Sequence, residues 1–318
     1  MILLLLALQL MRYRRVLSVQ ARNQLIYGVL QKQAGIITQA RSKYNPSDKL
    51  TTENTVNKQE SIAFVWQNIV NEVSLVLKDE PMLANFLQTT VLDHNNMGES
   101  LSFHLASKLS NQAIPFATLR PLFNEIFANE QILYAASRDI QATVDRDSAC
   151  SVYSTPFLYF KGFLALQAYR VTHQLWQRGN QSLALMLQHS ISTHFAVDIH
   201  PAAKIGSGIL IDHATGLVIG ETAVVEDSVS IMQSVTLGGT GKESGDRHPK
   251  IRKNVLLGPG AKVLGNIEVA EGSMVAASSV VLKSVPAHSV IAGVPAEVVG
   301  KADVDKPSKV MNHYFKPC

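Results

Sequence analysis

The amino-acid sequence predicts an α + β protein in which an all-helical domain is followed by a parallel β-helix built from hexapeptide repeats. Two observations support this prediction. Apolar residues recur at helical spacing in the first part of the chain, and after Phe195 they recur every six residues. A spacing of six is a multiple of two but not of about 3.6, so these residues fit the inner face of short strands and cannot share one face of a helix.

The helical domain is expected over residues 61–195. Ile62, Trp66, Ile69 and Val73 lie on one face of an amphipathic helix, which Pro81 interrupts. Further helices are expected over four stretches: 82–92, 101–109, 122–133 and 157–176.

The β-helix is expected over residues 196–300. Small or aliphatic residues occupy every sixth position in two series: Ile199, Ile205, Ile211, Leu217, Ala223, Val229 and Val235, then Ile251, Leu257, Val263, Val269, Val275 and Val281. A short fixed period of this kind indicates a solenoid of stacked coils. The phase breaks between the two series, across a loop at 236–250, and such insertions usually lie on a functional face.

The two ends of the chain carry no repeat. Residues 1–60 begin with MILLLLALQLM, which is too short for a spanning helix and has its basic residues after the apolar run, where a signal peptide has them before it. We expect this extension to be disordered or not native, and we expect no membrane partner. Residues 301–318 form a C-terminal tail.

Composition excludes several classes of protein. Apolar residues make up 46% of the chain and charged residues 17%, which excludes global disorder. The net charge of +4 is not concentrated in one segment, so we expect no nucleic-acid partner. Cys150 and Cys318 are too few for a disulfide framework and indicate a reducing, cytoplasmic location.

Two segments carry a resemblance to a known family: VDIHPAAKIGSGILIDHATGLVIGETAVVEDSVSIMQSVTLGGTGKESGDRHPKIRKNVLLGPGAKVLGNIEV in the β-helix, and RDSACSVYSTPFLYFKGFLALQAYR before it. They resemble the serine O-acetyltransferases of bacteria and plants, from about residue 60 to about residue 313. The resemblance implies a left-handed β-helix that assembles as a trimer or a dimer of trimers. It also implies transfer of acetyl from acetyl-CoA to the hydroxyl of L-serine, which gives O-acetyl-L-serine for cysteine biosynthesis.

The reaction requires a general base. A serine hydroxyl must lose its proton as it attacks a thioester, and histidine suits this role because its unperturbed pKa of about 6.5 lies near working pH. His213, within IDHATG, is the predicted base. Asp198 lies nearly one coil of about eighteen residues earlier, on a neighbouring face, and is predicted to orient the imidazole. The resemblance assigns the same pair.

Serine carries an ammonium and a carboxylate, so its site needs at least one acidic and one basic group. By resemblance, Asp147 and Asp212 hold the amino group, and Arg247 and His248 hold the carboxylate. The fork of an arginine suits a carboxylate because it can donate two parallel hydrogen bonds.

The resemblance also implies partners. Acetyl-CoA is expected between neighbouring subunits, with Gly238, Gly239 and Ala277 as its binding residues, and no metal is expected. L-Cysteine has the same ammonium and carboxylate as serine and is expected as a feedback inhibitor. Relatives that join cysteine synthase end in isoleucine, whereas this chain ends at Cys318, so we do not expect that complex.

Other functions stay open at this point. A β-helix acyltransferase could act on homoserine or on a sugar instead. A zinc enzyme would need three interface histidines, for which His194, His200 and His213 are available. A scaffold without activity is disfavoured by the intact pair of Asp198 and His213.

Overall fold

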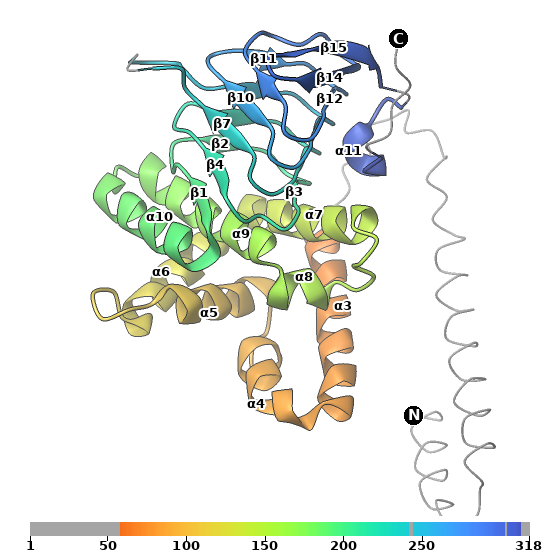
Figure 1. The fold of residues 1–318 in the computed structure, drawn as a ribbon. Helices are drawn as coiled ribbons and strands as arrows, with labels where there is room; N and C mark the ends of the chain where they lie inside the picture. Colours follow the sequence, from red (N-terminus) through yellow and green to blue (C-terminus); the bar gives the residue numbers. More distant parts are fainter. Residues whose placement is uncertain (1–57, 242–243, 303, 313–318) are drawn as a thin grey trace, which may run out of the picture. The chain divides into compact units, whose positions relative to one another are not determined.

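The structure is a computed structural model that describes residues 58–241, 244–302 and 304–312 of the 318-residue chain. These residues all lie in one compact unit, Val56–Cys318. The predictions for residues 1–57 and for Cys318 fall outside the described residues. The predicted fold class is confirmed, because a helical region is followed by a parallel β-solenoid (Figure 1). The proposed division into domains stays a prediction.

The helical region is formed by short and medium-length helices that begin at residue 58 and end at residue 195. In chain order they are α3 (Lys58–Asp79), the 3-10 turn η1 (Pro81–Leu83), α4 (Ala84–Leu87), the π-helical turn η2 (Gln88–Leu92), α5 (Met97–Leu109), α6 (Phe116–Phe127), α7 (Glu130–Arg146), α8 (Ser154–Tyr159), α9 (Lys161–Gln177) and α10 (Gln181–Phe195).

Two helices that the sequence predicts as continuous are each broken in the structure. The expected helix at 122–133 is wrong, because α6 ends at Phe127 and α7 begins at Glu130, where the Asn129 side chain accepts a hydrogen bond from the backbone of Gln131. The expected helix at 157–176 is interrupted at Phe160, which has extended backbone between α8 and α9. Apolar periodicity continues through both breaks and therefore conceals them.

The expected helix at 82–92 is also irregular, since η1, α4 and η2 replace one regular helix there. The expected helix at 101–109 begins earlier, at Met97. The Asn96 side chain caps it by accepting from the backbone N–H of Glu99, while the Glu99 carboxylate accepts from the backbone N–H of Asn95.

Three parallel sheets form the walls of the solenoid. The first sheet contains β1 (Val197–Ile199), β4 (Leu217–Ile219), β7 (Thr236–Gly238), β10 (Lys262–Leu264) and β13 (Val280–Val281). The second contains β2 (Lys204–Ile205), β5 (Val224–Val225), β8 (Lys250–Ile251) and β11 (Glu268–Val269). The third contains β3 (Leu210–Ile211), β6 (Ser230–Ile231), β9 (Leu256–Leu257), β12 (Met274–Val275), β14 (Ser289–Gly293) and the antiparallel β15 (Ala296–Lys301).

Coil length is not uniform, and this corrects the predicted repeat. Regular coils advance eighteen residues, as from Lys262 to Val280. The coil that pairs Val197 with Leu217 has twenty residues, and the coil that pairs Thr236 with Lys262 has twenty-six. The six-residue phase therefore breaks twice, and only the second break is visible in the spacing of the apolar residues.

Because of the first break, three residues that were predicted to point inward from strands lie outside the strands. Ala223, Val229 and Val235 are buried, but they lie at the corners just before the strands. The strand residues that fill the interior are instead Val225, Ile231 and Leu237.

The extra residues lie at two different edges of the solenoid. We call the turns between the third and first sheets the His213 edge: 212–216, 232–235, 258–261 and 276–279. We call the turns between the first and second sheets the Arg247 edge: 200–203, 220–223, 239–249 and 265–267. Two extra residues lie in the first turn of the His213 edge and eight in the long loop of the Arg247 edge, as the strand registers require.

A buried ion pair joins the helical region to the first coil. Arg170 of α9 and Asp139 of α7 approach to 2.6 Å, with side chains 9% and 1% exposed. Asp139 also accepts from the backbone N–H of Ile209 at 2.9 Å, and Arg170 donates to the carbonyl of Gly206 at 2.8 Å. Burial raises the pKa of Asp139, which Arg170 opposes. These contacts link α7 and α9 to the first coil, and losing either partner of the pair would leave an uncompensated buried charge.

The short helix α11 (Pro307–Val310) contacts both α7 and the third sheet (Figure 1). Ser308 is fully buried there. Its hydroxyl donates to the carbonyl of Ser228 at 2.6 Å, and its own carbonyl accepts from the hydroxyl of Ser230 at 2.8 Å. The last described part of the chain thus packs against the region where the helices meet the β-helix.

Candidate active site

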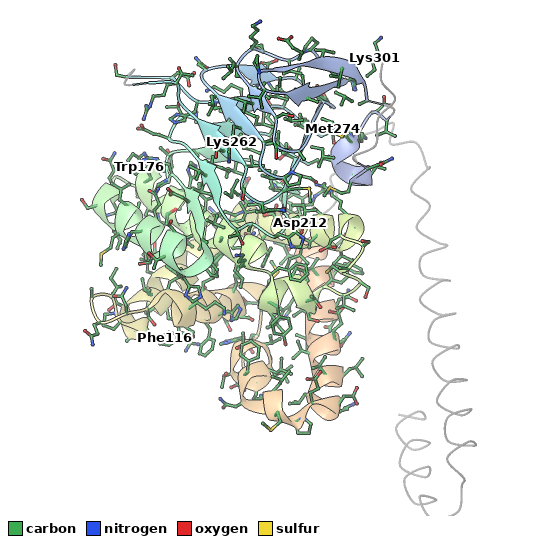
Figure 2. The ribbon with its side chains drawn as sticks, in the orientation of Figure 1. Phe116, Trp176, Asp212, Lys262, Met274 and Lys301 are labelled. Atoms are coloured by element: carbon green, nitrogen blue, oxygen red, sulfur yellow. The ribbon has the colours of Figure 1, made fainter. Side chains whose placement is uncertain are left out.

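The His213 edge presents the predicted general base on an unusual turn. His213 and Ala214 have φ values of 54° and 62°, a left-handed backbone conformation that few residues other than glycine adopt. The amide of Ala214 donates to the carbonyl of Asp212 at 2.6 Å, and that of Thr215 donates to the carbonyl of His213 at 2.7 Å. The His213 side chain is 73% exposed, and its Nε2 lies 3.8 Å from Oδ2 of Asp212. The turn therefore exposes an imidazole beside a carboxylate (Figure 2 labels Asp212).

Asp198 lies close to this turn but has another partner. The amide of Gly216 donates to the carbonyl of Ala196 at 2.8 Å, which brings the turn beside the start of β1. The Asp198 carboxylate accepts a hydrogen bond from Nε2 of Gln188 in α10 at 2.6 Å. Within the described residues no hydrogen bond joins Asp198 to His213, so the orienting role of Asp198 stays a prediction.

Asp147 ends helix α7 next to the strand that leads to Asp212. The preceding residue, Arg146, donates from Nη1 to the hydroxyl of Ser230 at 3.1 Å. Ser230 pairs with Leu210 in the third sheet, and Asp212 follows two residues after Leu210. The fold therefore directs Asp147 and Asp212, the two residues predicted to bind the amino group, to the same part of the molecule.

Helix α9 supports the His213 turn from below. A Cβ on Gly162 would lie 2.1 Å from the carbonyl oxygen of Ile211, so glycine is required for this close approach. Lys161 donates from Nζ to Oγ1 of Thr215. The start of α9 thus contacts the chain on both sides of His213.

The Arg247 edge carries the predicted carboxylate-binding residues. Arg247 Nη2 is 2.6 Å from Oε2 of Glu221, and this hydrogen bond lowers the pKa of the Glu221 carboxyl. His248 is 7% exposed and accepts at Nδ1 from Thr222. Burial, helped by the charge of Arg247, lowers the pKa of His248. At neutral pH this edge therefore presents a guanidinium beside a neutral imidazole.

The residues predicted to bind acetyl-CoA divide between the two edges. Gly238 ends β7 and Gly239 begins the long loop, where a Cβ on Gly239 would lie 3.6 Å from the carbonyl oxygen of Arg247. Ala277 lies in the turn between β12 and β13, at the His213 edge. Their part in binding stays a prediction.

The first sheet separates the two groups of predicted residues within one chain. Asp212 and His213 precede β4 at one side of this sheet, whereas Arg247 and His248 belong to the loop that follows β7 at the other side. The structure brings together the members of each group but not the two groups.

Sequence reasoning missed several contacts around the site. Thr222 and Glu221 hold His248 and Arg247, although the pattern marks them only as corner residues. Gln188 holds Asp198, and Ser230 anchors Arg146, the residue before Asp147. Among these supporting residues, Arg146 could have been suspected from the sequence because it is adjacent to Asp147. Gln188 has no such signal.

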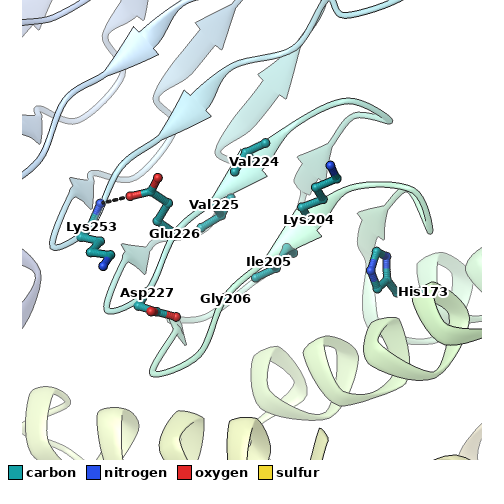
Figure 3. A pocket seen from close by; sticks show the side chains of 9 residues that line it. All are labelled: His173, Lys204, Ile205, Gly206, Val224, Val225, Glu226, Asp227 and Lys253. Atoms are coloured by element: carbon teal, nitrogen blue, oxygen red, sulfur yellow. Dashed lines mark hydrogen bonds between the residues drawn. The ribbon is translucent and has the colours of Figure 1, made fainter. Parts of the chain in front are cut away.

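A separate cavity of about 400 Å³ lies on the second sheet, between the solenoid and α9 (Figure 3). Its lining residues are His173, Lys204, Ile205, Gly206, Val224, Val225, Glu226, Asp227 and Lys253. None of the predicted site residues lines it. The described residues contain no group of three or more His, Cys, Asp or Glu placed to hold a metal ion, and none of their helices is long and apolar enough to cross a membrane.

Comparisons with known proteins show which family the chain resembles. Residues 65–168 match the family model described as "Serine acetyltransferase, N-terminal". A serine acetyltransferase of Salmonella typhimurium is 55% identical over 257 residues, which is 80% of this chain and 94% of the relative.

Solved structures agree as well. One titled as a serine acetyltransferase in complex with cysteine is 53% identical, with a TM-score of 0.78, and the match covers 80% of this chain and 99% of the other. A serine acetyltransferase from Brucella abortus in complex with coenzyme A is 48% identical, with a TM-score of 0.73, over 74% of this chain and 95% of the other. The chain belongs to the serine acetyltransferase family.

Proposed function

We propose that His213 is the general base with which this chain transfers acetyl from acetyl-CoA to the hydroxyl of L-serine. As a member of its family the chain is an acyltransferase that uses acetyl-CoA as donor. The observation that carries the proposal is the exposed imidazole of His213, held out on a left-handed turn with a carboxylate oxygen 3.8 Å away. The hydroxyl of a bound substrate can contact the base only if the base is exposed.

The steps follow from this geometry. The His213 imidazole takes the proton of the serine hydroxyl as the oxygen attacks the thioester carbon. The carbon–sulfur bond then breaks, and the thiolate of CoA receives the proton from the imidazolium. The products are O-acetyl-L-serine and CoA, and the enzyme returns to its starting state. Asp198 orients the imidazole when substrate is bound.

The other predicted residues hold the substrates. Asp147 and Asp212 place two carboxylates near the base for the ammonium of serine. Arg247 and His248 provide a guanidinium and an N–H donor for its carboxylate. Gly238, Gly239 and Ala277 offer backbone groups and small side chains to the pantetheine arm of acetyl-CoA.

A complete site requires a second copy of the chain. One chain carries the base at one side of the first sheet and the carboxylate-binding pair at the other. A cyclic trimer in which the His213 edge of each copy meets the Arg247 edge of the next joins the two halves three times. A pair of such trimers would contain the same sites. Acetyl-CoA then lies between neighbouring copies.

L-Cysteine is proposed to bind at the same place, because it has the same ammonium and carboxylate as L-serine. A relative whose structure is titled as a complex with cysteine supports this. The cytoplasmic location and cysteine biosynthesis as the pathway served stay predictions.

The reaction and its acceptor can be tested together. We would measure thiol release from acetyl-CoA with L-serine, L-homoserine and a panel of sugars as acceptors. Thiol release with L-serine, at a kcat/KM well above that of every other acceptor, is the expected result. A preference for homoserine or a sugar would contradict the proposed acceptor, and no thiol release would contradict the proposed reaction.

A further inference from the structure

The side chain of His248 is held by a single residue, Thr222, which lies at the corner between β4 and β5. The Thr222 hydroxyl is 2.9 Å from Nδ1 of His248. The same oxygen accepts the backbone N–H groups of Arg247 at 3.0 Å and of His248 at 3.1 Å. One hydroxyl therefore holds the backbone of both residues predicted to bind the carboxylate of serine and also contacts the His248 ring.

The backbone of Thr222 determines which ring nitrogen carries the proton. Its N–H points at Nδ1 of His248 at a distance of 3.2 Å. An amide N–H can only donate, so Nδ1 must be the acceptor. This conclusion does not depend on which group accepts the hydrogen of the Thr222 hydroxyl. In a neutral imidazole one nitrogen accepts and the other donates. The proton of His248 therefore lies on Nε2.

The ring is neutral and has little freedom to turn. Burial and the charge of Arg247 lower the pKa of His248. The ring lies against Gly220, where an added Cβ would come within 2.0 Å of Cδ2 and Nε2. Lys250 also fastens the loop, since its Nζ donates to the carbonyls of Thr222 at 2.9 Å and His248 at 2.7 Å.

We propose that Thr222 is a positioning residue that holds His248 in the tautomer protonated on Nε2, so that His248 donates a hydrogen bond to the substrate carboxylate. This inference rests on the proposed function, since that function supplies the ligand. Within the described residues, Nε2 of His248 has no hydrogen-bond partner in the protein. It is therefore the ring nitrogen left for a ligand.

The first test removes the hydroxyl but keeps the shape of the side chain. Thr222→Val should lower kcat/KM for L-serine about 10- to 100-fold, mainly through a raised KM, and leave the KM for acetyl-CoA nearly unchanged. Thr222→Ser restores the hydroxyl and should restore the KM. Thr118→Val, at an exposed position of α6, is the matched control. An unchanged serine KM in Thr222→Val would overturn the positioning role.

The second test asks which ring nitrogen donates. The amide nitrogen of glutamine falls near the position of Nε2, whereas that of asparagine falls near Nδ1. His248→Gln should therefore retain at least about tenfold more kcat/KM for serine than His248→Asn. Equal or greater activity in His248→Asn would overturn the assignment, and this comparison holds even where Thr222→Val folds poorly.

Two further measurements separate tautomer control from general support of the loop. The loss of kcat/KM for serine on Thr222→Val should be clearly smaller in the His248→Ala background than in the wild type, because no ring is then left for the Thr222 hydroxyl to position. In protein labelled with ¹⁵N-histidine, the His248 signals should show Nε2 protonated and Nδ1 bare. An undiminished cost or the opposite tautomer would contradict the inference. Failure of the wild type to acetylate serine would instead contradict the proposed function.

Discussion

The two edges of the β-helix that carry predicted site residues differ in how they hold a histidine. At the His213 edge two extra residues form a left-handed turn, and the imidazole is 73% exposed. At the Arg247 edge eight extra residues form a long loop, and His248 is 7% exposed with its Nδ1 occupied by Thr222. The exposed ring is suited to move a proton, whereas the buried ring is suited to hold a fixed group.

A third edge, between the second and third sheets, provides the contrast. Its turns, 206–209, 226–229, 252–255 and 270–273, carry none of the predicted catalytic or binding residues. The predicted base and the predicted carboxylate-binding residues thus lie in the two turns where the coil departs from its regular length.

The largest effect is expected at the His213 edge. His213→Ala should lower kcat about 10²- to 10⁴-fold, because a general base contributes about that much to proton transfer. The KM values should change little. Steady-state kinetics with L-serine and acetyl-CoA would measure this, with the exposed His189→Ala as the control. A kcat near that of the wild type would remove His213 from the chemistry.

A smaller effect, on binding, is expected at the Arg247 edge. Arg247→Ala should raise the KM for L-serine about 10- to 100-fold, since it removes a charge-assisted hydrogen bond to a carboxylate. The KM for acetyl-CoA should be much less affected. Arg178→Ala, which removes a surface ion pair with Glu125, is the matched control. If kcat falls instead while the serine KM is unchanged, the proposed roles of the two edges are wrong.

A still smaller effect is expected where the helices meet the solenoid. Ser230→Ala removes the hydroxyl that accepts from Arg146 and donates to the carbonyl of Ser308. The KM for serine should rise about fivefold, as the loss of one ordinary hydrogen bond would give, because Asp147 loses part of its support. Steady-state kinetics with serine as the varied substrate, and then with acetyl-CoA as the varied substrate, would measure the two KM values separately. An equal change in both KM values would indicate general destabilisation.

The smallest effect on activity, but a clear one on stability, is expected at His104 in the helical region. Burial lowers the pKa of His104 to about 4, and its Nε2 is 3.1 Å from the carbonyl of Leu158. In the unfolded chain the His104 ring binds a proton near pH 6.5, and in the folded chain only near pH 4. The free energy of unfolding should therefore decrease by about 3 kcal/mol as the pH is lowered from 6.5 to 4.

His104→Gln tests this pH dependence. Glutamine keeps a donor for the Leu158 carbonyl and cannot titrate in this range. Urea unfolding at pH 7 and pH 4.5 should show a smaller loss of stability in His104→Gln than in the wild type. The exposed His189→Gln should behave like the wild type. Identical pH dependence in His104→Gln and wild type would rule out His104 as the source.

Much of the fold could be predicted from the sequence, because side chains inside a solenoid repeat with the coil. The expansion beside His213 was hidden because Leu217 happens to occupy the expected sixth position while the strand is shifted by two. The break at Phe160 was hidden because apolar residues continue across it. A periodic pattern reports which residues are buried, but it does not report where the backbone changes direction.

The site could be predicted less completely. The family resemblance supplied His213, Asp212, Arg247 and His248, and the structure divides them into two pairs. Thr222 contacts His248 across the long loop, and Gln188 contacts Asp198 from the preceding helix α10. Such contacts leave no spacing signal, so they became visible only when the coils were stacked.

The central claim is that one catalytic site uses the His213 edge of one copy and the Arg247 edge of another. The most direct test mixes His213→Ala and Arg247→Ala protomers, allows them to reassemble, and assays them at L-serine well below the wild-type KM, where each variant alone has low activity. Random assembly into trimers should give sites with both native edges in about a quarter of cases, and activity should return to about that fraction of the wild type. If the mixture stays as inactive as its two components, both edges of the site belong to one chain and the account is contradicted.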